Sequence, residues 1–198
     1  MELLHPECKL VMHAGDAGPV GYDESFDAMM LHGLHGMAGS GGVLSHSFSP
    51  FPKNIWVDNL KIGEIALNMA SFGEKGVPTV LVTGDMTAIE EAKALVPGIE
   101  GAIVKWALDE KEKFGALSVR KVISLSPEKA QSIIKEAARN AIEKIGLVKP
   151  FMIPIPFNLR VEYIEAKYAK GITTSLGVTR LDEVTIIKKC HNLDDIVF

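Results

Sequence analysis

Three histidines lie close together in a glycine-rich segment, and their side chains could bind zinc or transfer protons near neutral pH. They are His32, His35 and His46, and five glycines fall between residues 32 and 42. Imidazole nitrogens ligate zinc, and imidazole titrates close to pH 7. Glycine permits unusual backbone angles and a close approach to a ligand. The alternative is that these are surface histidines of a loop or histidines that cap a turn.

Two acidic residues stand where a carboxylate could bind a metal ion. Glu64 lies in the first turn of an expected helix, where the helix dipole favours a negative charge. Its alternative role is that of a favourable N-terminal glutamate on a solvated face. Asp85 ends an apolar run, and we favour a role in the turn, which aspartate often organises between a strand and a helix. Lys105 lies inside another apolar run, from which it could reach a cleft or a buried carboxylate.

Helices are predicted to position several of these residues. Helical spacing places Glu64 and Asn68 on one face of a helix. The apolar residues of its other face are Ile62, Ile65, Met69 and Phe72. A second helix is predicted to open with a capping box formed by Thr87 and Glu90. The longest helix is predicted from an N-cap at Ser126 to about residue 145.

Short apolar or alternating runs predict the strands. They cover residues 9–13, 28–31, 55–57, 80–85, 101–106, 119–123, 159–164 and 183–188. A charged loop is expected up to residue 114, and prolines between residues 150 and 156 predict an extended crossing between lobes. The expected fold class is α/β, with mixed sheets, flanking helices and two lobes around a cleft. We treat residues 1–198 as one region, with lobes 1–53 and 54–198 as one possible division.

The composition excludes several classes of protein. Of the 198 residues 47% are hydrophobic and 23% are charged, as in ordinary globular proteins. The net charge is −4 and the basic residues are spread along the chain, so we expect no nucleic-acid partner. No apolar stretch is long enough to span a membrane, and Cys8 and Cys190 form no disulfide framework. A cytoplasmic protein is expected. A plain nucleotide binder is disfavoured because no glycine-rich phosphate motif follows a strand.

Several short stretches, taken in order, resemble the D-aminopeptidases of the DppA type. They are residues 4–7 (LHPE), 34–36 (LHG), 43–47 (VLSHS), 63–68 (GEIALN), 82–85 (VTGD), 102–105 (AIVK) and 125–130 (LSPEKA). Each stretch is unspecific alone. Their order makes the set fairly specific, together with spacings of 11 residues from His35 to His46 and 18 from His46 to Glu64.

The resemblance implies a zinc peptidase that removes N-terminal D-residues from short peptides. It implies that His35 and Glu64 are metal ligands, whereas His46 sits at the reaction centre rather than on the metal. It gives Asn68 and Asp85 supporting places. Family members hold two zinc ions in one site, and this chain is expected to supply only part of the ligands.

Family members also carry an acidic D-x-E pair on a first strand and a further histidine ligand, both of which would precede residue 4. We therefore expect the N-terminal strand of the family to be missing from this sequence. A sheet that lacks this strand exposes an edge and apolar surface, so a homo-oligomer is expected. The alternative is a catalytically inactive or incomplete family member that acts as a binding or assembly subunit.

Overall fold

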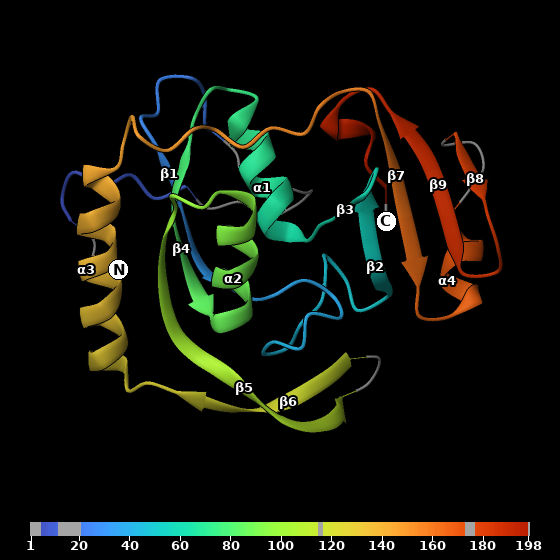
Figure 1. Cartoon of the computed structure of the whole chain (residues 1–198), viewed down its shortest axis with the longest axis horizontal. Coiled ribbons are helices and arrows are strands. Elements are labelled where there is room, and N and C mark those ends of the chain that lie inside the picture. Colours follow the sequence, from blue (N-terminus) through green and yellow to red (C-terminus); the bar gives the residue numbers. More distant parts are fainter. Residues whose placement is uncertain (1–4, 12–20, 115–116, 173–176, 198) are drawn as a thin grey trace.

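The computed structural model describes residues 5–11, 21–114, 117–172 and 177–197. The structure contains two β-sheets, and helix α1 lies between β1 and β4 of the first sheet and the strands of the second (Figure 1). The expected α/β class with mixed sheets and flanking helices is confirmed.

The first sheet has four strands in the order β1-β4-β5-β6. These are β1 (Met29–Leu34), β4 (Thr79–Asp85), β5 (Glu100–Phe114) and β6 (Leu117–Ser124). Strands β1, β4 and β5 run parallel, and β6 returns antiparallel to β5. Every residue of β4 is buried, as expected for a continuous apolar run at the centre of a parallel sheet. The carboxyl ends of β1 and β4 therefore reach the same edge of the sheet.

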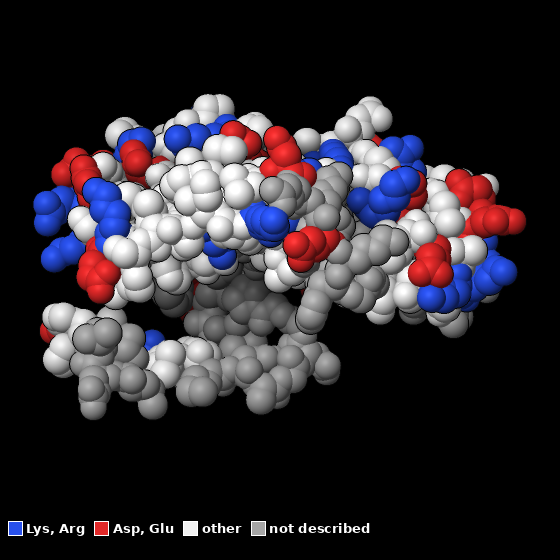
Figure 2. Space-filling model, turned by 90° about the horizontal axis from the view of Figure 1, so that it is seen from below, with Lys and Arg blue, Asp and Glu red and all other residues white. Residues whose placement is uncertain are grey.

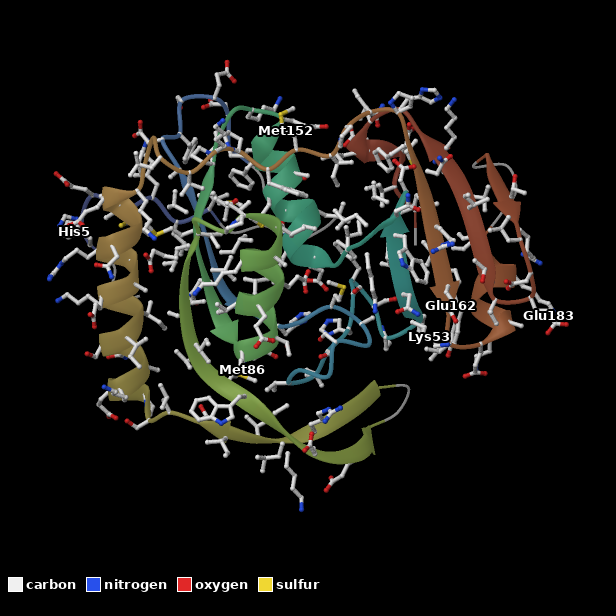
Figure 3. All side chains as sticks on the ribbon, viewed as in Figure 1. His5, Lys53, Met86, Met152, Glu162 and Glu183 are labelled. Atoms are coloured by element: carbon white, nitrogen blue, oxygen red, sulfur yellow. The ribbon has the colours of Figure 1, made fainter. Side chains whose placement is uncertain are left out.

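The second sheet is entirely antiparallel, in the order β3-β2-β7-β9-β8. Its strands are β2 (Pro52–Val57), β3 (Leu60–Lys61), β7 (Phe157–Tyr163), β8 (Val178–Arg180) and β9 (Thr185–Cys190). Alternate residues of β7 are buried, which is the pattern of a strand with one covered face. Lys53 on β2 and Glu162 on β7 form an ion pair of 2.7 Å across the strands (Figure 3).

Four α-helices and one 3-10 helix are described. They are α1 (Glu64–Gly73), α2 (Met86–Leu95), α3 (Pro127–Glu143), α4 (Ala166–Gly171) and the 3-10 helix Leu193–Asp195. Helix α1 joins the two halves of the core: Ala66 and Ala70 pack in the cluster of the second sheet, whereas Ile65 and Met69 pack with β4 and α2. No described helix is both long and apolar enough to cross a membrane.

The predicted start of the second helix is wrong by two residues. The N-cap of α2 is Asp85, whose carboxylate accepts the backbone N–H of Ala88 at 2.8 Å. The hydroxyl of Thr87 donates to the same carboxylate instead of capping the helix, and Glu90 is exposed. The charged aspartate at the end of β4 is a stronger acceptor than a threonine hydroxyl, and its extended backbone suits the cap position.

The expected loop after residue 106 is also wrong, because β5 continues to Phe114 and forms a long hairpin with β6. Asp109 and Glu112 of this half are exposed, and charged side chains are compatible with a strand where its face meets solvent. The expected helix capped by Ser126 is confirmed as α3. Residues 9–11 form no strand, and the rest of that expected strand lies outside the described residues.

The extended crossing that the prolines predict is confirmed, since residues 149–156 contain no helix or strand between α3 and β7. In Figure 1 this segment runs along the upper side of the molecule from the first sheet to the second. Figure 2 shows that acidic and basic residues alternate along the face seen from below, where neither sign forms a large patch.

Candidate metal centre

Three side chains from separate parts of the sequence come together in one cluster, His35, His46 and Glu64. Each offers one ligand atom, and the three atoms lie within 4.8 Å of one another. His35 Nε2 is 3.9 Å from Glu64 Oε2, and His46 Nε2 is 3.7 Å from Glu64 Oε1. The side chains are 20–25% exposed, so water can reach them. Two imidazoles and a carboxylate are a donor set that suits zinc.

The first sheet and α1 supply the framework of this cluster. His35 directly follows β1, and Glu64 is the first residue of α1. The end of β1 passes very close to Gly84 of β4, where an added Cβ atom would lie 1.9 Å from the carbonyl oxygen of Leu34. Only glycine fits this contact, which places the residue after Leu34 at the edge of the sheet.

Hydrogen bonds to backbone carbonyls determine which nitrogen of each imidazole is free. His46 Nδ1–H donates to the carbonyl of Leu44 at 2.8 Å, and His35 Nδ1–H donates to the carbonyl of Gly36 at 3.2 Å. A carbonyl oxygen can only accept, so Nδ1 carries the proton in each neutral ring. The lone pair of Nε2 therefore points away from these bonds and is available to a metal ion or a proton. The two rings stack with centroids 4.1 Å apart.

The turn around His46 holds backbone conformations that side chains rarely adopt. Leu44 and Phe48 both have positive φ angles, 52° and 61°. For residues with a Cβ atom each such conformation costs about 1–2 kcal/mol. In this turn the Leu44 carbonyl accepts the hydrogen bond from His46 Nδ1. The backbone N–H of Phe48 donates to Glu64 Oε1 at 2.6 Å. The strain thus accompanies the two backbone contacts that orient the cluster, as is common at functional sites.

Asp85 anchors the loop that carries both histidines. Its carboxylate is fully buried and accepts the backbone N–H of Val43 at 2.7 Å, besides capping α2. The backbone N–H of Ala38 donates to the buried hydroxyl of Ser47 at 3.0 Å and closes the loop on itself. The expected turn role of Asp85 is confirmed, and its position in the cap explains why it lies outside the three-residue cluster.

The other residues singled out from the sequence lie outside the three-residue cluster. The Asn68 amide donates to the backbone carbonyl of Glu64 at 2.8 Å, one helical turn back. His32 is exposed on β1, and its Nδ1 lies 2.7 Å from the Thr83 hydroxyl. His32 is thus in contact with β4 and is not one of the three residues of the cluster. Lys105 lies opposite Asp85 in the β4–β5 register and is half-buried.

Glu91 is the acidic residue near the cluster that the sequence patterns missed. It is 9% exposed on α2, and its carboxylate accepts the backbone N–H of Met37 at 3.0 Å. Burial raises the pKa of this carboxyl to about 7. A usable signal existed in the sequence, because Glu91 falls on the apolar stripe of α2 beside Ala88 and Ala92. A charged residue on a buried stripe needs a specific partner.

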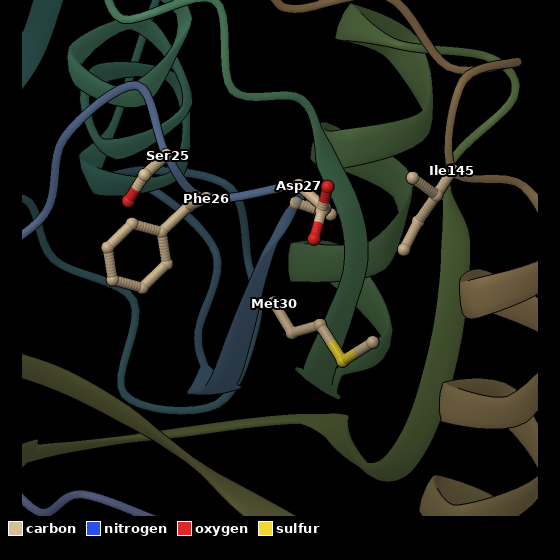
Figure 4. Close-up of a pocket in the computed structure, with 6 residues that line it drawn as sticks. Ser25, Phe26, Asp27, Met30 and Ile145 are labelled. Atoms are coloured by element: carbon tan, nitrogen blue, oxygen red, sulfur yellow. The ribbon is translucent and has the colours of Figure 1, made fainter.

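A separate surface hollow lies beside β1, lined by Ser25, Phe26, Asp27, Ala28, Met30 and Ile145. Figure 4 shows the Met30 and Phe26 side chains at this hollow, which none of the three cluster residues lines. Asp27 is the one carboxylate of this lining, which includes no histidine and no cysteine. Among the described residues, the group that could hold a metal ion is the cluster and not this hollow.

Comparisons with known proteins agree on one family. The family model of the M55 peptidases, described as D-aminopeptidases, matches residues 1–197. A D-aminopeptidase of Bacillus subtilis (strain 168) is 31% identical over 167 residues, which cover 82% of this chain and 57% of the relative. The chain thus spans little more than half the length of that relative.

A solved structure is similar across most of the chain. It is the Zn-dependent D-aminopeptidase DppA from Bacillus subtilis, described as a self-compartmentalizing protease. The TM-score is 0.79 with 28% sequence identity, over 97% of this chain and 68% of the DppA chain. Together with the family match, this similarity shows that the chain belongs to the D-aminopeptidase family of M55 peptidases.

Proposed function

We propose that this protein is a zinc-dependent aminopeptidase that hydrolyses the bond after an N-terminal D-amino acid in short peptides. The observation that carries the proposal is the cluster of His35, His46 and Glu64, whose ligand atoms lie within 4.8 Å of one another. Family membership and the Zn-dependence of the similar DppA structure support zinc as the metal and a D-peptide as the substrate.

His35 and Glu64 are the proposed metal ligands. His35 presents an unprotonated Nε2 because its Nδ1–H is bonded to a carbonyl, and Glu64 keeps Oε2 clear of the Phe48 contact on Oε1. When bound, zinc lowers the pKa of a bound water toward 7 and polarises a carbonyl group. We also propose that two zinc ions share this site, as the family resemblance implies, and that these residues are only part of their ligand set.

His46 is the proposed general acid and base. Its Nε2 faces the carboxylate side of the cluster, where it can accept the proton of the attacking water. The hydroxyl oxygen then bonds to the scissile carbonyl carbon, the C–N bond breaks, and the proton passes from Nε2 to the leaving amine. The bond from Nδ1–H to the Leu44 carbonyl keeps the ring oriented through both transfers. Asn68 and Asp85 have supporting roles, in the first turn of α1 and in the loop anchor.

We further propose that residues 1–198 act as one D-aminopeptidase-like region of a cytoplasmic homo-oligomer. The two cysteines are consistent with a reducing compartment, since Cys8 is exposed and Cys190 is buried. Several large apolar side chains are exposed, among them Leu147 at 79% and Met152 at 59%, and such surface favours association. The similar DppA is described as self-compartmentalizing.

The experiment is hydrolysis of D-alanine p-nitroanilide in the presence of zinc, compared with the L-isomer and with a Glu64→Gln variant. We expect release of nitroaniline from the D-isomer that is lost on chelation and in Glu64→Gln. Zinc binding without any hydrolysis would instead support the alternative of an inactive family member that serves as a binding or assembly subunit. Hydrolysis that persists in Glu64→Gln would contradict the proposed site.

A further inference from the structure

The buried carboxylate of Glu91 lies against the two segments that carry the proposed ligands His35 and Glu64. Its helix, α2, contributes none of the three cluster residues. Glu91 is on α2, and its side chain reaches the loop between β1 and β2. Oε2 accepts the backbone N–H of Met37 at 3.0 Å. Oε1 is buried and has no hydrogen-bond partner among the residues that the structure describes. A buried carboxylate that is only half satisfied costs free energy, so its retention calls for an explanation.

The position of Glu91 joins the two segments that carry the proposed ligands. Met37 is two residues after His35, and Gly63 is the residue before Glu64. The three parts are in close contact, since a Cβ atom on Gly63 would lie 2.5 Å from the Met37 Cβ atom and 3.0 Å from Glu91 Oε1. Oε2 of Glu91 thus contacts the histidine loop, and Oε1 lies against the start of α1.

The charges around Glu91 do not, taken together, stabilise its ionised carboxylate. Burial raises the pKa of its carboxyl to about 7, and the negative charges of Asp85 and Glu64 add to this effect. Only the Met37 N–H bond and the charge of Lys61 act in the opposite direction. An apolar residue at this point of the buried stripe would avoid the cost, but it could not accept the Met37 N–H. The hydrogen bond is therefore the contribution specific to Glu91.

We infer that Glu91 is a positioning residue of the metal centre, which holds the His35 loop in register with Glu64 by accepting the backbone N–H of Met37. The inference rests on the proposed metal site and adds to it a residue that touches neither metal nor substrate. A ligand held in place before the metal binds loses less freedom on binding, so a residue that fixes the loop raises metal affinity.

Two variants of Glu91 separate the effect of side-chain length from the effect of negative charge. Glu91→Asp keeps the charge but shortens the side chain by one methylene, so it loses the Met37 N–H. Glu91→Gln keeps the length and an acceptor oxygen but removes the charge. Glu90→Gln makes the same change at the neighbouring exposed residue and is the matched control. Zinc affinity is measured by competition with a chelating dye, and the unfolding free energy of each zinc-free variant is measured alongside.

We expect Glu91→Asp to weaken zinc binding about tenfold or more, in the range found for residues that support metal ligands. Glu91→Gln should remain within about threefold of the wild type, and Glu90→Gln should match it. A Glu91→Asp variant that binds zinc like the wild type would overturn the inference. So would Glu91→Gln weakening as much as Glu91→Asp. A wild-type chain that binds no zinc would instead overturn the proposed function.

A measurement on the wild type needs no variant to fold. The Met37 amide should exchange slowly with deuterium in the zinc-free protein, and more slowly still when zinc is bound. If this amide exchanges as fast as the exposed amide of Gly39 with and without zinc, then Glu91 does not hold the loop and the inference is wrong.

Discussion

His46 is the residue whose proposed role is most directly separable from that of its neighbours. Its Nε2 lies as near to Glu64 as His35 Nε2 does, at 3.7 Å against 3.9 Å. From its position alone, His46 could be a third metal ligand or a residue that transfers protons. The two roles differ in what remains after the side chain is removed, because a proton carrier can be lost without loss of the metal.

We predict that His46→Ala retains the zinc content of the wild type while kcat falls by about 10²–10⁴, the usual contribution of a general acid or base. Zinc is measured by mass spectrometry and kcat with the D-alanine anilide. His35→Ala is the companion variant, for which zinc itself should be lost. If His46→Ala loses zinc to the same extent, His46 is a ligand and the role proposed here is wrong.

The buried carboxyl of Glu91 leads to a second prediction, on how the unfolding free energy depends on pH. Its pKa is about 7 in the folded state against an ordinary value of 4.5, so between these values the folded protein binds more protons than the unfolded chain. The unfolding free energy of the zinc-free protein should therefore fall as pH rises from 4.5 to 7, by about 3 kcal/mol from this group. Denaturant unfolding at several pH values measures the slope. Glu91→Gln should remove it and Glu90→Gln should retain it; equal slopes in all three proteins would refute the prediction.

At the scale of elements, the start of α2 performs two tasks with one side chain. The Asp85 carboxylate caps the helix through Ala88 and anchors the histidine loop through Val43. The sequence marked Asp85 as a turn residue but assigned the cap to Thr87, since the capping-box pattern is local. Val43 is 42 residues away in the chain, so no local pattern could show this contact.

We predict that Asp85→Ala lowers the unfolding free energy by about 2–4 kcal/mol, because it removes a cap and leaves a buried N–H without an acceptor. Ser126→Ala removes the cap of α3 at an exposed position and should cost about 1 kcal/mol. Urea denaturation of both variants gives the comparison. A loss in Asp85→Ala no larger than that in Ser126→Ala would mean that the loop does not depend on this carboxylate.

The same contrast between local and distant information explains which elements the sequence could predict. Helix α3 was predicted because its N-cap and the proline after it are adjacent in the sequence. The long strand β5 was missed beyond residue 106 because its charged half pairs only with β6, and pairing is not visible in composition. In the cluster, residue types and the family resemblance singled out His35, His46 and Glu64. Two further contacts could not be predicted, namely the Phe48 backbone N–H on Glu64 and the Met37 backbone N–H on Glu91. Both depend on the conformation of the loop, which sequence periodicity does not describe.

At the scale of the whole molecule, helix α1 packs with both sheets, and several large apolar side chains are exposed. Leu147 and Met152 line one surface depression and are 79% and 59% exposed. We predict that the protein sediments as an oligomer, well above the 21.5 kDa of one chain, because association removes such surface from water. Sedimentation velocity at micromolar concentration tests this. A single species with the mass of one chain would contradict the proposed homo-oligomer.

The central claim is that His35 and Glu64 hold zinc in the cluster that they form with His46. A zinc titration measured by calorimetry tests this claim most directly. The wild type and Glu64→Ala are titrated after metal removal, with the exposed Glu90→Ala as the control. We predict binding in the wild type and in the control, and a loss of affinity of at least about a hundredfold in Glu64→Ala, since a direct ligand should cost at least as much as the residues that support ligands. Equal zinc binding in the wild type and Glu64→Ala, or none in the wild type, would contradict the account.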